Sequence, residues 1–148
     1  MVNILDIFFL EANGFYLCGS RALGTETLDS DWDMVAEYSI AKEGLLKEIG
    51  FSDETYKFDI LAGPDKIVVA SYLDVNTVKI FSLAQAGQNK IQAVLVKSVE
   101  SKLRITKMLK SNADLRALDM SLKGTHARVY LWNSFYSLLF VDTNASDV

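Results

Sequence analysis

The chain has 148 residues, of which half are apolar and 23% are charged, and its formal net charge is −4. This length suits one globular domain over residues 1–148 with a single core, and the apolar share argues against a disordered chain. An acidic chain lacks the broad basic surface that charge-driven binding to a nucleic-acid backbone requires, although a local basic patch remains compatible with it.

The cysteine count and the hydropathy of the chain further limit which disulfides, compartments and membrane segments are expected. The single cysteine, Cys18, lies in an apolar run, so a disulfide framework is excluded and Cys18 is expected to be a small buried residue. A reducing compartment, the cytoplasm, is therefore expected. No apolar stretch approaches the roughly 20 residues that a membrane-spanning helix needs, so we expect no membrane partner.

Apolar periodicity and turn residues predict the elements of the first third of the chain. A helix is expected at 3–12, followed by strands near 15–18 and 32–38. Residues 41–49 have apolar side chains at helical spacing, and Gly50 is expected to close that helix.

The middle of the chain is rich in β-branched and apolar residues, which favour strands. Strands are expected at 56–61, 66–73 and 75–83. Turns are expected at 63–65, where Gly, Pro and Asp follow one another, and near Asp74.

From about residue 89 onward the pattern is interpreted as helical, with breaks at Ser111-Asn112 and at Gly124. Thr125 is expected to cap the final helix. A broad apolar face on that helix carries Val129, Trp132, Phe135, Tyr136 and Leu139. Together these elements predict a small mixed sheet with flanking helices, an α/β (α+β) fold.

The most informative segment begins at Gly19-Ser20, directly after an apolar run at residues 15–18. Glycine has no Cβ, so the backbone can turn tightly here and approach a ligand closely. If the chain enters a short helix at this point, the unpaired N–H groups of its first turn favour an anion such as a triphosphate.

Two carboxylates follow on the next predicted strand. Asp31 and Asp33 are separated by one residue, and residues i and i+2 of a strand project from the same face. Carboxylates held this close repel each other unless a cation lies between them. Mg²⁺ is the expected ion, because it prefers oxygen ligands and usually shares its coordination shell with substrate phosphates.

The segment resembles the signature of the DNA polymerase beta-like nucleotidyltransferase superfamily: a Gly-Ser turn, a loop of about ten residues, and an Asp-hydrophobic-Asp unit on the next strand. Its Gly-Ser-Arg-Ala-x-Gly-Thr and Ser-Asp-Trp-Asp sequences are most similar to the small, often phage-encoded, predicted nucleotidyltransferases. The resemblance implies that Gly19, Ser20 and the turn amides hold a triphosphate and that Asp31 and Asp33 bind the metal. Arg21 occupies a position typical of the family.

The resemblance also implies a third carboxylate on a neighbouring strand, and three residues are candidates for that position. Asp59, which follows an apolar residue, is slightly favoured as the base that accepts the proton of an incoming hydroxyl. Asp74 is the second candidate. Asn76 is the third, and it can ligate a metal through its amide oxygen but cannot act as a general base at neutral pH.

Basic residues near the start of the last predicted helix are further candidates for triphosphate binding. Lys123 and Arg128 lie close to a helix N-terminus, which suits phosphate. The alternative, which we favour, is a solvated basic end on an amphipathic helix. His126 is the only histidine, which excludes a metal site built from several histidines.

Together, these residues predict a Mg²⁺-dependent nucleotidyltransferase. It would transfer a nucleoside monophosphate from an NTP to a hydroxyl of a protein, RNA or small molecule and release pyrophosphate, with one or two Mg²⁺ ions at Asp31 and Asp33. Two other classes stay open. One is a catalytically degenerate relative that acts as a phage-encoded inhibitor or binding module. The other is a phage accessory protein that works through protein–protein contact.

Overall fold

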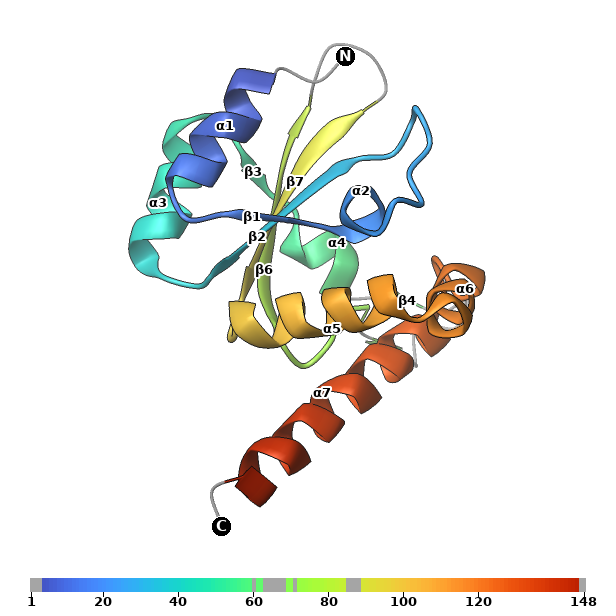
Figure 1. Cartoon of the computed structure of the whole chain (residues 1–148). Helices are drawn as coiled ribbons and strands as arrows, with labels where there is room; N and C mark the ends of the chain where they lie inside the picture. Colours follow the sequence, from blue (N-terminus) through green and yellow to red (C-terminus); the bar gives the residue numbers. More distant parts are fainter. Residues whose placement is uncertain (1–3, 60, 63–68, 71, 85–88, 147–148) are drawn as a thin grey trace. The chain divides into compact units, whose positions relative to one another are not determined.

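The computed structural model describes residues 4–59, 61–62, 69–70, 72–84 and 89–146 of the chain (Figure 1). It is an α+β fold with a five-stranded mixed sheet and flanking helices. The chain divides into two compact units. The first comprises Met1–Tyr56 and Thr77–Val99, and the second comprises Lys57–Asn76 and Glu100–Val148.

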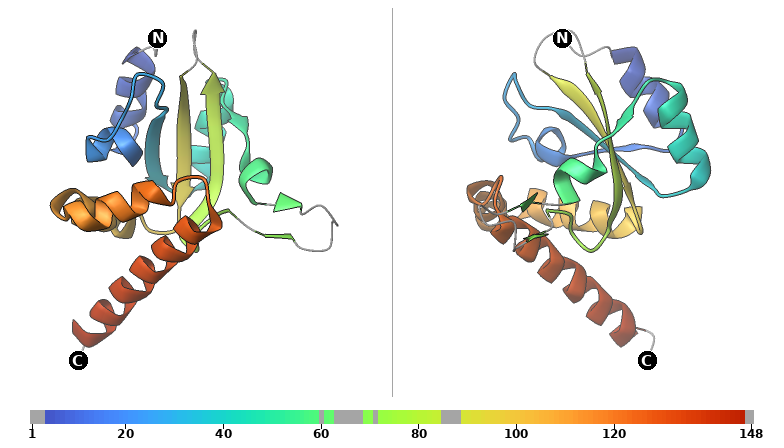
Figure 2. Two further views of the ribbon diagram at one scale, coloured as in Figure 1. Left: turned by 90° about the vertical axis from the view of Figure 1, so that its right-hand side faces the viewer. Right: turned by 180° about the vertical axis from the view of Figure 1, so that it is seen from behind.

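The first unit contains the five-stranded sheet, in the order β1-β2-β7-β6-β3. Strands β2 and β7 are parallel, and the other neighbouring pairs are antiparallel. The strand bounds are β1 Tyr16–Cys18, β2 Trp32–Glu37, β3 Ser52–Asp53, β6 Thr77–Ala84 and β7 Lys90–Val96. Helix α2, Gly19–Leu23, follows β1 directly and leads through a loop into β2 (Figures 1 and 2).

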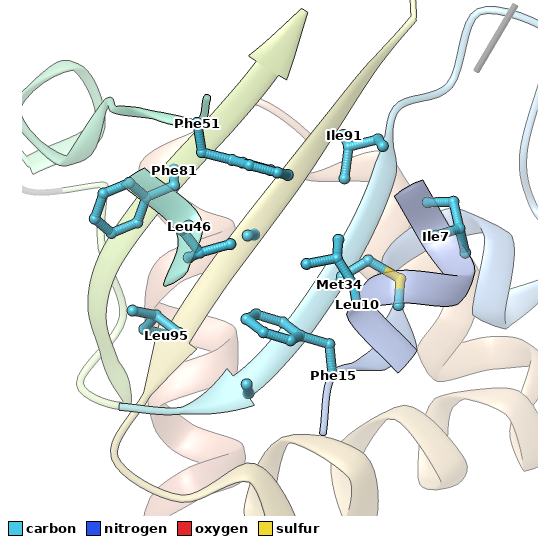
Figure 3. Packing of buried hydrophobic residues seen from close by; sticks show 11 residues of the cluster. Ile7, Leu10, Phe15, Met34, Leu46, Phe51, Phe81, Ile91 and Leu95 are labelled. Carbon is cyan, nitrogen blue, oxygen red and sulfur yellow. The ribbon is translucent and has the colours of Figure 1, made fainter. Parts of the chain in front are cut away.

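Helices α1, Ile4–Ala12, and α3, Ile40–Glu48, cover one face of this sheet (Figures 1 and 2). Figure 3 shows their apolar side chains meeting those of the strands in the core of the unit. Full burial of a side chain such as Leu or Phe stabilises the fold by about 1.5–3 kcal/mol. The buried cluster comprises Ile7, Leu10, Phe15, Met34, Ala36, Leu46, Phe51, Phe81, Ile91, Ala93 and Leu95.

Helix α3 is held at its start and on its flank by polar contacts. The Ser39 hydroxyl caps the helix by accepting a hydrogen bond from the Lys42 N–H at 3.0 Å. The Glu43 carboxylate pairs with the ammonium of Lys79 on β6 and also accepts a hydrogen bond from the Tyr38 hydroxyl. The hydrogen bond from Lys79 lowers the pKa of Glu43, and the same bond raises the pKa of Lys79.

The second unit contains a two-stranded antiparallel sheet, β4 Leu61–Ala62 with β5 Val69–Ala70, and most of the C-terminal helices. The helices are α5 Val99–Ser111, α6 Ala113–Ser121 and α7 His126–Ser146. Trp132, Phe135 and Tyr136 are buried, as the predicted apolar face of the last helix requires. None of the described helices combines the length and apolar character of a membrane span.

The elements predicted at 3–12, 15–18, 32–38, 41–49 and 75–83 correspond to α1, β1, β2, α3 and β6. The strand predicted at 56–61 is wrong over 56–59, because residues Thr55–Asp59 form helix α4, while Leu61 begins the two-residue strand β4. The Asp53 carboxylate accepts a hydrogen bond from the Thr55 N–H at 2.9 Å, which turns the chain locally. Tyr56 and Phe58 are aromatic residues at alternate positions, a pattern that favours a strand, but the local turn starts a helix instead.

In the strand predicted at 66–73, only Val69–Ala70 is found as a strand, β5, while Tyr72 and Leu73 are not in a strand. Residues 66–68 and 71 lie outside the described residues, as does the turn predicted at 63–65. The turn expected near Asp74 is present, immediately before β6.

The prediction that the chain becomes helical from residue 89 is also wrong. Residues Lys90–Val96 form β7, which lies between β2 and β6 in the sheet. Its apolar side chains are buried on both faces of the sheet, so its sequence lacks the polar alternation of a half-exposed strand. The first C-terminal helix, α5, begins only at Val99.

The two predicted helix breaks are confirmed, but the predicted cap is not. The Asn112 side chain accepts a hydrogen bond from the Leu115 N–H at 3.1 Å and caps α6, and Gly124 has φ +77° just before α7. The Thr125 hydroxyl instead donates to the Leu122 carbonyl at 2.6 Å. It is therefore engaged with the preceding turn and does not cap α7.

Candidate functional site

The turn at Gly19-Ser20 lies directly against Asp33, the second aspartate of the pair. Cys18, the last residue of β1, is the register partner of Asp33 on β2, and Gly19 follows it with φ +70°. A Cβ at position 19 would lie 2.9 Å from Cγ and 3.0 Å from Cβ of Asp33, and closer still to a carboxylate oxygen. Glycine is therefore required here both by its left-handed backbone and by the space that Asp33 fills.

Asp31 and Asp33 lie on the same side of the sheet, opposite the face that α1 and α3 cover. Asp31 immediately precedes β2, and one of its carboxylate oxygens accepts a hydrogen bond from the Lys90 N–H at 3.2 Å. Both aspartates are half-buried. Alternation along β2 points Asp31 and Asp33 to one face, while Met34 points to the core (Figure 3).

Arg21 of α2 holds the loop that carries Asp31. Its guanidinium donates to the Ser30 carbonyl at 2.9 Å and lies over the Trp32 ring at 4.3 Å. The side-chain amide of Asn89 donates to the Leu28 carbonyl of the same loop at 2.8 Å. Arg21 and Asn89 thus both hold the loop that leads into Asp31 and β2.

The strand register places a row of polar side chains across this face of the sheet. Cys18 on β1 pairs with Asp33 on β2, Asp33 pairs with Gln92 on β7, and Gln92 pairs with Ser82 on β6. Ser82 is 6% exposed, and its hydroxyl has no hydrogen-bond partner in the described part of the chain. The half-buried amide of Gln92 makes no hydrogen bond to the described residues either.

Sequence reasoning missed two residues of this face, Gln92 and Lys90. Both lie on β7, which was predicted as helix, and both project from the same face as Asp33, with Lys90 next to Asp31. One signal was present. Gln92 is a single polar residue within an otherwise apolar run of β-branched and small side chains.

The three candidates for the third position all belong to the second unit. Asp59 is the last residue of helix α4 and does not lie in the predicted strand, and its side chain lies outside the described part. The Asp74 carboxylate accepts a hydrogen bond from the N–H of Asn76 at 3.0 Å. Asn76 is buried immediately before β6.

Carboxylates are missing from the two strands that follow β2 across the sheet. Neither Thr77–Ala84 nor Lys90–Val96 contains Asp or Glu. Within the described residues, no group of three or more His, Cys, Asp or Glu side chains is placed to hold a metal ion. In the register of the sheet, Asp33 is therefore followed by the Gln92 amide on β7 and then by the Ser82 hydroxyl on β6.

The basic residues near α7 have structural partners in the second unit. The Arg128 guanidinium donates two hydrogen bonds of 2.9 Å to the carboxylate of Asp119, which is fully buried. The Trp132 indole N–H donates to the same carboxylate at 2.7 Å. His126 stacks on Tyr72 with ring centroids 4.2 Å apart, while Lys123 is exposed.

Comparison of the chain with protein-family models, with curated proteins and with solved structures found no match. The donor set of the site consists of oxygen atoms, from the Asp31 and Asp33 carboxylates, the Gln92 amide and the Ser20 hydroxyl. Such a set fits a hard cation such as Mg²⁺. A side chain at position 19 would collide with the Asp33 carboxylate, so the glycine is needed for that carboxylate to keep its place.

Proposed function

We propose that the chain is a Mg²⁺-dependent nucleotidyltransferase that transfers a nucleoside monophosphate from an NTP, such as ATP, to a hydroxyl group. The acceptor would be a protein, an RNA or a small molecule, and pyrophosphate would leave. The observation that supports this best is the packing of Gly19 against Asp33. It brings a glycine-serine turn and a pair of carboxylates together on one sheet.

Four residues of the first unit have a role in this proposal. Asp31 and Asp33 would hold the ion, and the ion when bound neutralises charge on the phosphate oxygens. The Ser20 hydroxyl would donate a hydrogen bond to the outer phosphates, because it makes no hydrogen bond to the described residues. Arg21 would keep the loop before β2 in place through Ser30 and Trp32.

The reaction also needs a base for the proton of the attacking hydroxyl. In the proposed step the acceptor oxygen bonds to the α-phosphorus, the bond between the α-phosphorus and the bridging oxygen breaks, and the proton leaves the acceptor. Asp59 and Asp74 remain the proposed bases. Gln92 and Asn76 are amides and cannot take up this proton at neutral pH.

We place this activity in the cytoplasm, or in the host cytoplasm if a phage encodes the chain. NTPs and Mg²⁺ are available there. The single cysteine, Cys18, is buried and has no second cysteine in the sequence with which to form a disulfide, which agrees with a reducing compartment.

A second candidate function is nucleotide binding without transfer, as in an inhibitor or binding module. The observation that favours it is the amide of Gln92 in register beside Asp33, on a strand that carries no carboxylate. If no base reaches the site, Asp31 and Asp33 would still bind a metal–nucleotide complex but the acceptor hydroxyl would not be deprotonated.

The test uses the full chain, each of the four α-labelled NTPs, Mg²⁺ and a bacterial cell extract as the source of acceptors. Transfer of label by the wild-type chain and by Asp29→Asn, but not by Asp33→Asn, would support the proposal. Asp29 is an exposed residue of the same loop, so Asp29→Asn is a matched control.

Binding of a fluorescent ATP analogue, measured in parallel, separates the two candidates. Mg²⁺-dependent binding that Asp33→Asn abolishes, without label transfer from any of the four NTPs, would favour nucleotide binding without transfer. A folded wild-type chain that neither binds the analogue nor transfers label would overturn both candidate functions.

A further inference from the structure

Helix α1 exposes apolar side chains on the side that faces away from the sheet. Ile7 and Leu10 point from the same helix into the core, as Figure 3 shows. On the opposite side, Leu5 is 69% exposed and Phe8 is 56% exposed. The exposed apolar face of α1 consists of Ile4, Leu5, Phe8, Phe9 and Ala12. A helix that is apolar on two opposite sides has a second face to bury, and a contiguous exposed patch of this kind marks an interaction site.

The exposed side chains form two rows, an arrangement that suits packing against another helix. Residues four apart lie one above the other on a helix with about 3.6 residues per turn. The first row is Ile4, Phe8 and Ala12, and the neighbouring row is Leu5 and Phe9. The groove between two such rows accepts a row of side chains from a second helix, which is the commonest packing of helices in globular proteins. The shape of this face therefore favours a helix as its occupant.

Both edges of the exposed apolar face are acidic. By helical spacing, the exposed Glu11 borders the first row and the half-buried Asp6 borders the second. The sequence of α1 contains no Lys or Arg. The ammonium of Lys42 on α3 lies beyond the end of α1, where it donates to the Asn13 carbonyl at 2.7 Å. The edges of the face are therefore complementary to basic side chains.

These charges argue against a second copy of the chain as the occupant. The first unit contains 11 Asp and Glu residues and 6 Lys and Arg residues, which gives it a formal charge of −5. A symmetric contact through α1 would bring together two apolar faces that both have acidic edges. The same edges disfavour the surface of an anionic membrane, which attracts basic segments.

We propose that the exposed face of α1 is the docking site for an α-helix of another protein, one whose apolar stripe is bordered by lysine or arginine. The apolar side chains of that helix would enter the groove between the two rows, and its cations would meet Asp6 and Glu11 at the edges. Because α1 covers the face of the sheet opposite to Asp31 and Asp33, this interaction is separate from the proposed nucleotide site.

The probe for this site is a fluorescent synthetic peptide of leucine and lysine whose leucines recur at helical spacing. A leucine–glutamate peptide with leucines at the same positions is its counterpart, and fluorescence anisotropy measures the affinity of the full chain for each. We expect the wild-type chain to bind the leucine–lysine peptide at least tenfold more tightly, and Phe8→Ser to weaken this binding at least tenfold. Leu28→Ser removes a 92% exposed apolar side chain from the loop before β2 and should bind as wild type.

Reversal of a single charge distinguishes docking on α1 from a general attraction between the peptide and an acidic chain. Glu11→Lys makes one edge of the face basic, and it should narrow the preference for the leucine–lysine peptide at least threefold. Asp29→Lys makes the same change in charge at an exposed position in the loop before β2 and should keep the wild-type preference. Glu11 and Asp29 are both exposed, so we expect both variants to fold, which circular dichroism checks.

The inference would be overturned if the wild-type chain bound both peptides equally, or if Glu11→Lys and Asp29→Lys changed the preference to the same extent. Equal affinities of Phe8→Ser and Leu28→Ser for the leucine–lysine peptide would also overturn it. A wild-type dimer in analytical ultracentrifugation that Phe8→Ser dissociates would instead assign the face to a second copy. Binding to vesicles of phosphatidylcholine and phosphatidylglycerol that Phe8→Ser abolishes would assign it to a membrane surface.

Discussion

The backbone of Gly19 packs against the carboxylate of Asp33, so the turn after β1 and the side chain from β2 share one space. Two features fix this contact. Cys18 and Asp33 are register partners in an antiparallel pair, and Gly19 leaves the strand with φ +70°. The conformation of the turn and the position of the carboxylate are therefore coupled.

Gly19→Ala should both destabilise the fold and displace Asp33. A left-handed conformation costs an alanine about 1–2 kcal/mol, and the new Cβ must also push the Asp33 carboxylate away. We expect the loss of unfolding free energy to exceed that backbone cost and the affinity for Mn²⁺, as a substitute for Mg²⁺, to fall at least tenfold. Urea denaturation and Mn²⁺ titration measure the two effects.

Gly24→Ala is the matched control, because Gly24 also has a positive φ, +74°, but a Cβ there meets no atom within 4 Å. It should show only the backbone cost of about 1–2 kcal/mol and bind Mn²⁺ normally. Equal effects of the two substitutions on Mn²⁺ binding would contradict a specific role for the Gly19–Asp33 contact.

Arg21→Lys should weaken metal binding through the loop that precedes β2. Lysine keeps the charge but lacks the planar guanidinium that bonds the Ser30 carbonyl and stacks on Trp32. We expect a loss of about 1 kcal/mol in stability and a severalfold weaker Mn²⁺ affinity. Arg104→Lys, at an exposed position of α5, is the control, and an Arg21→Lys chain with wild-type Mn²⁺ affinity would exclude this positioning role.

Much of the first third of the fold, which local sequence determines, was predictable. The apolar run of β1, the glycine that follows it, and the alternation of β2 each carry their own signal, and the two strands pair as consecutive neighbours. The contact between Gly19 and Asp33 follows from that pairing. Helix α3 was equally predictable, because its apolar residues at helical spacing and the glycine after it lie within one short segment.

The part that depends on distant pairing was not predictable from the pattern. Strand β7 has buried apolar side chains on both faces, and it pairs with β2 although Lys90 and Asp31 are 59 residues apart in sequence. Gln92 was missed for this reason. The second unit combines Lys57–Asn76 with a distant C-terminal segment, so no linker or change in composition marks it.

Asp119→Asn should destabilise the second unit. The fully buried Asp119 carboxylate accepts two hydrogen bonds from Arg128 and one from Trp132. Removing one partner of a buried ion pair leaves the other charge uncompensated, and we expect a loss of about 3 kcal/mol in unfolding free energy. Asp114→Asn, exposed in the first turn of α6, should cost at most about 0.5 kcal/mol. Similar losses for both variants would argue against this role of Asp119.

Arg128→Lys tests whether Arg128 also binds nucleotide. Because Nε and one terminal nitrogen of its guanidinium both donate to Asp119, we expect lower stability but unchanged affinity for the fluorescent ATP analogue in the presence of Mg²⁺. Circular dichroism establishes that the variant is folded at the temperature of the titration. A folded Arg128→Lys chain that loses ATP binding would assign Arg128 to the phosphate site.

The pair of Glu43 and Lys79 should make the stability of the first unit depend on pH. The pKa of Glu43 is lowered from 4.5 by its hydrogen bond to Lys79, so its contribution is present above pH 4.5 and is lost as the pH falls through the folded-state pKa. The pKa of Lys79 is raised from 10.5 by the same bond. Its contribution is therefore present below pH 10.5 and is lost as the pH rises through the folded-state pKa.

Glu43→Gln should consequently be less stable than wild type at pH 7, and this difference should shrink as the pH falls below 4.5. Urea denaturation of both chains across this range measures it. Glu48→Gln changes an exposed carboxylate at the end of the same helix and should show no such trend. A Glu43→Gln difference that stays constant from neutral to acid pH would mean that the charge of Glu43 does not stabilise the contact between α3 and β6.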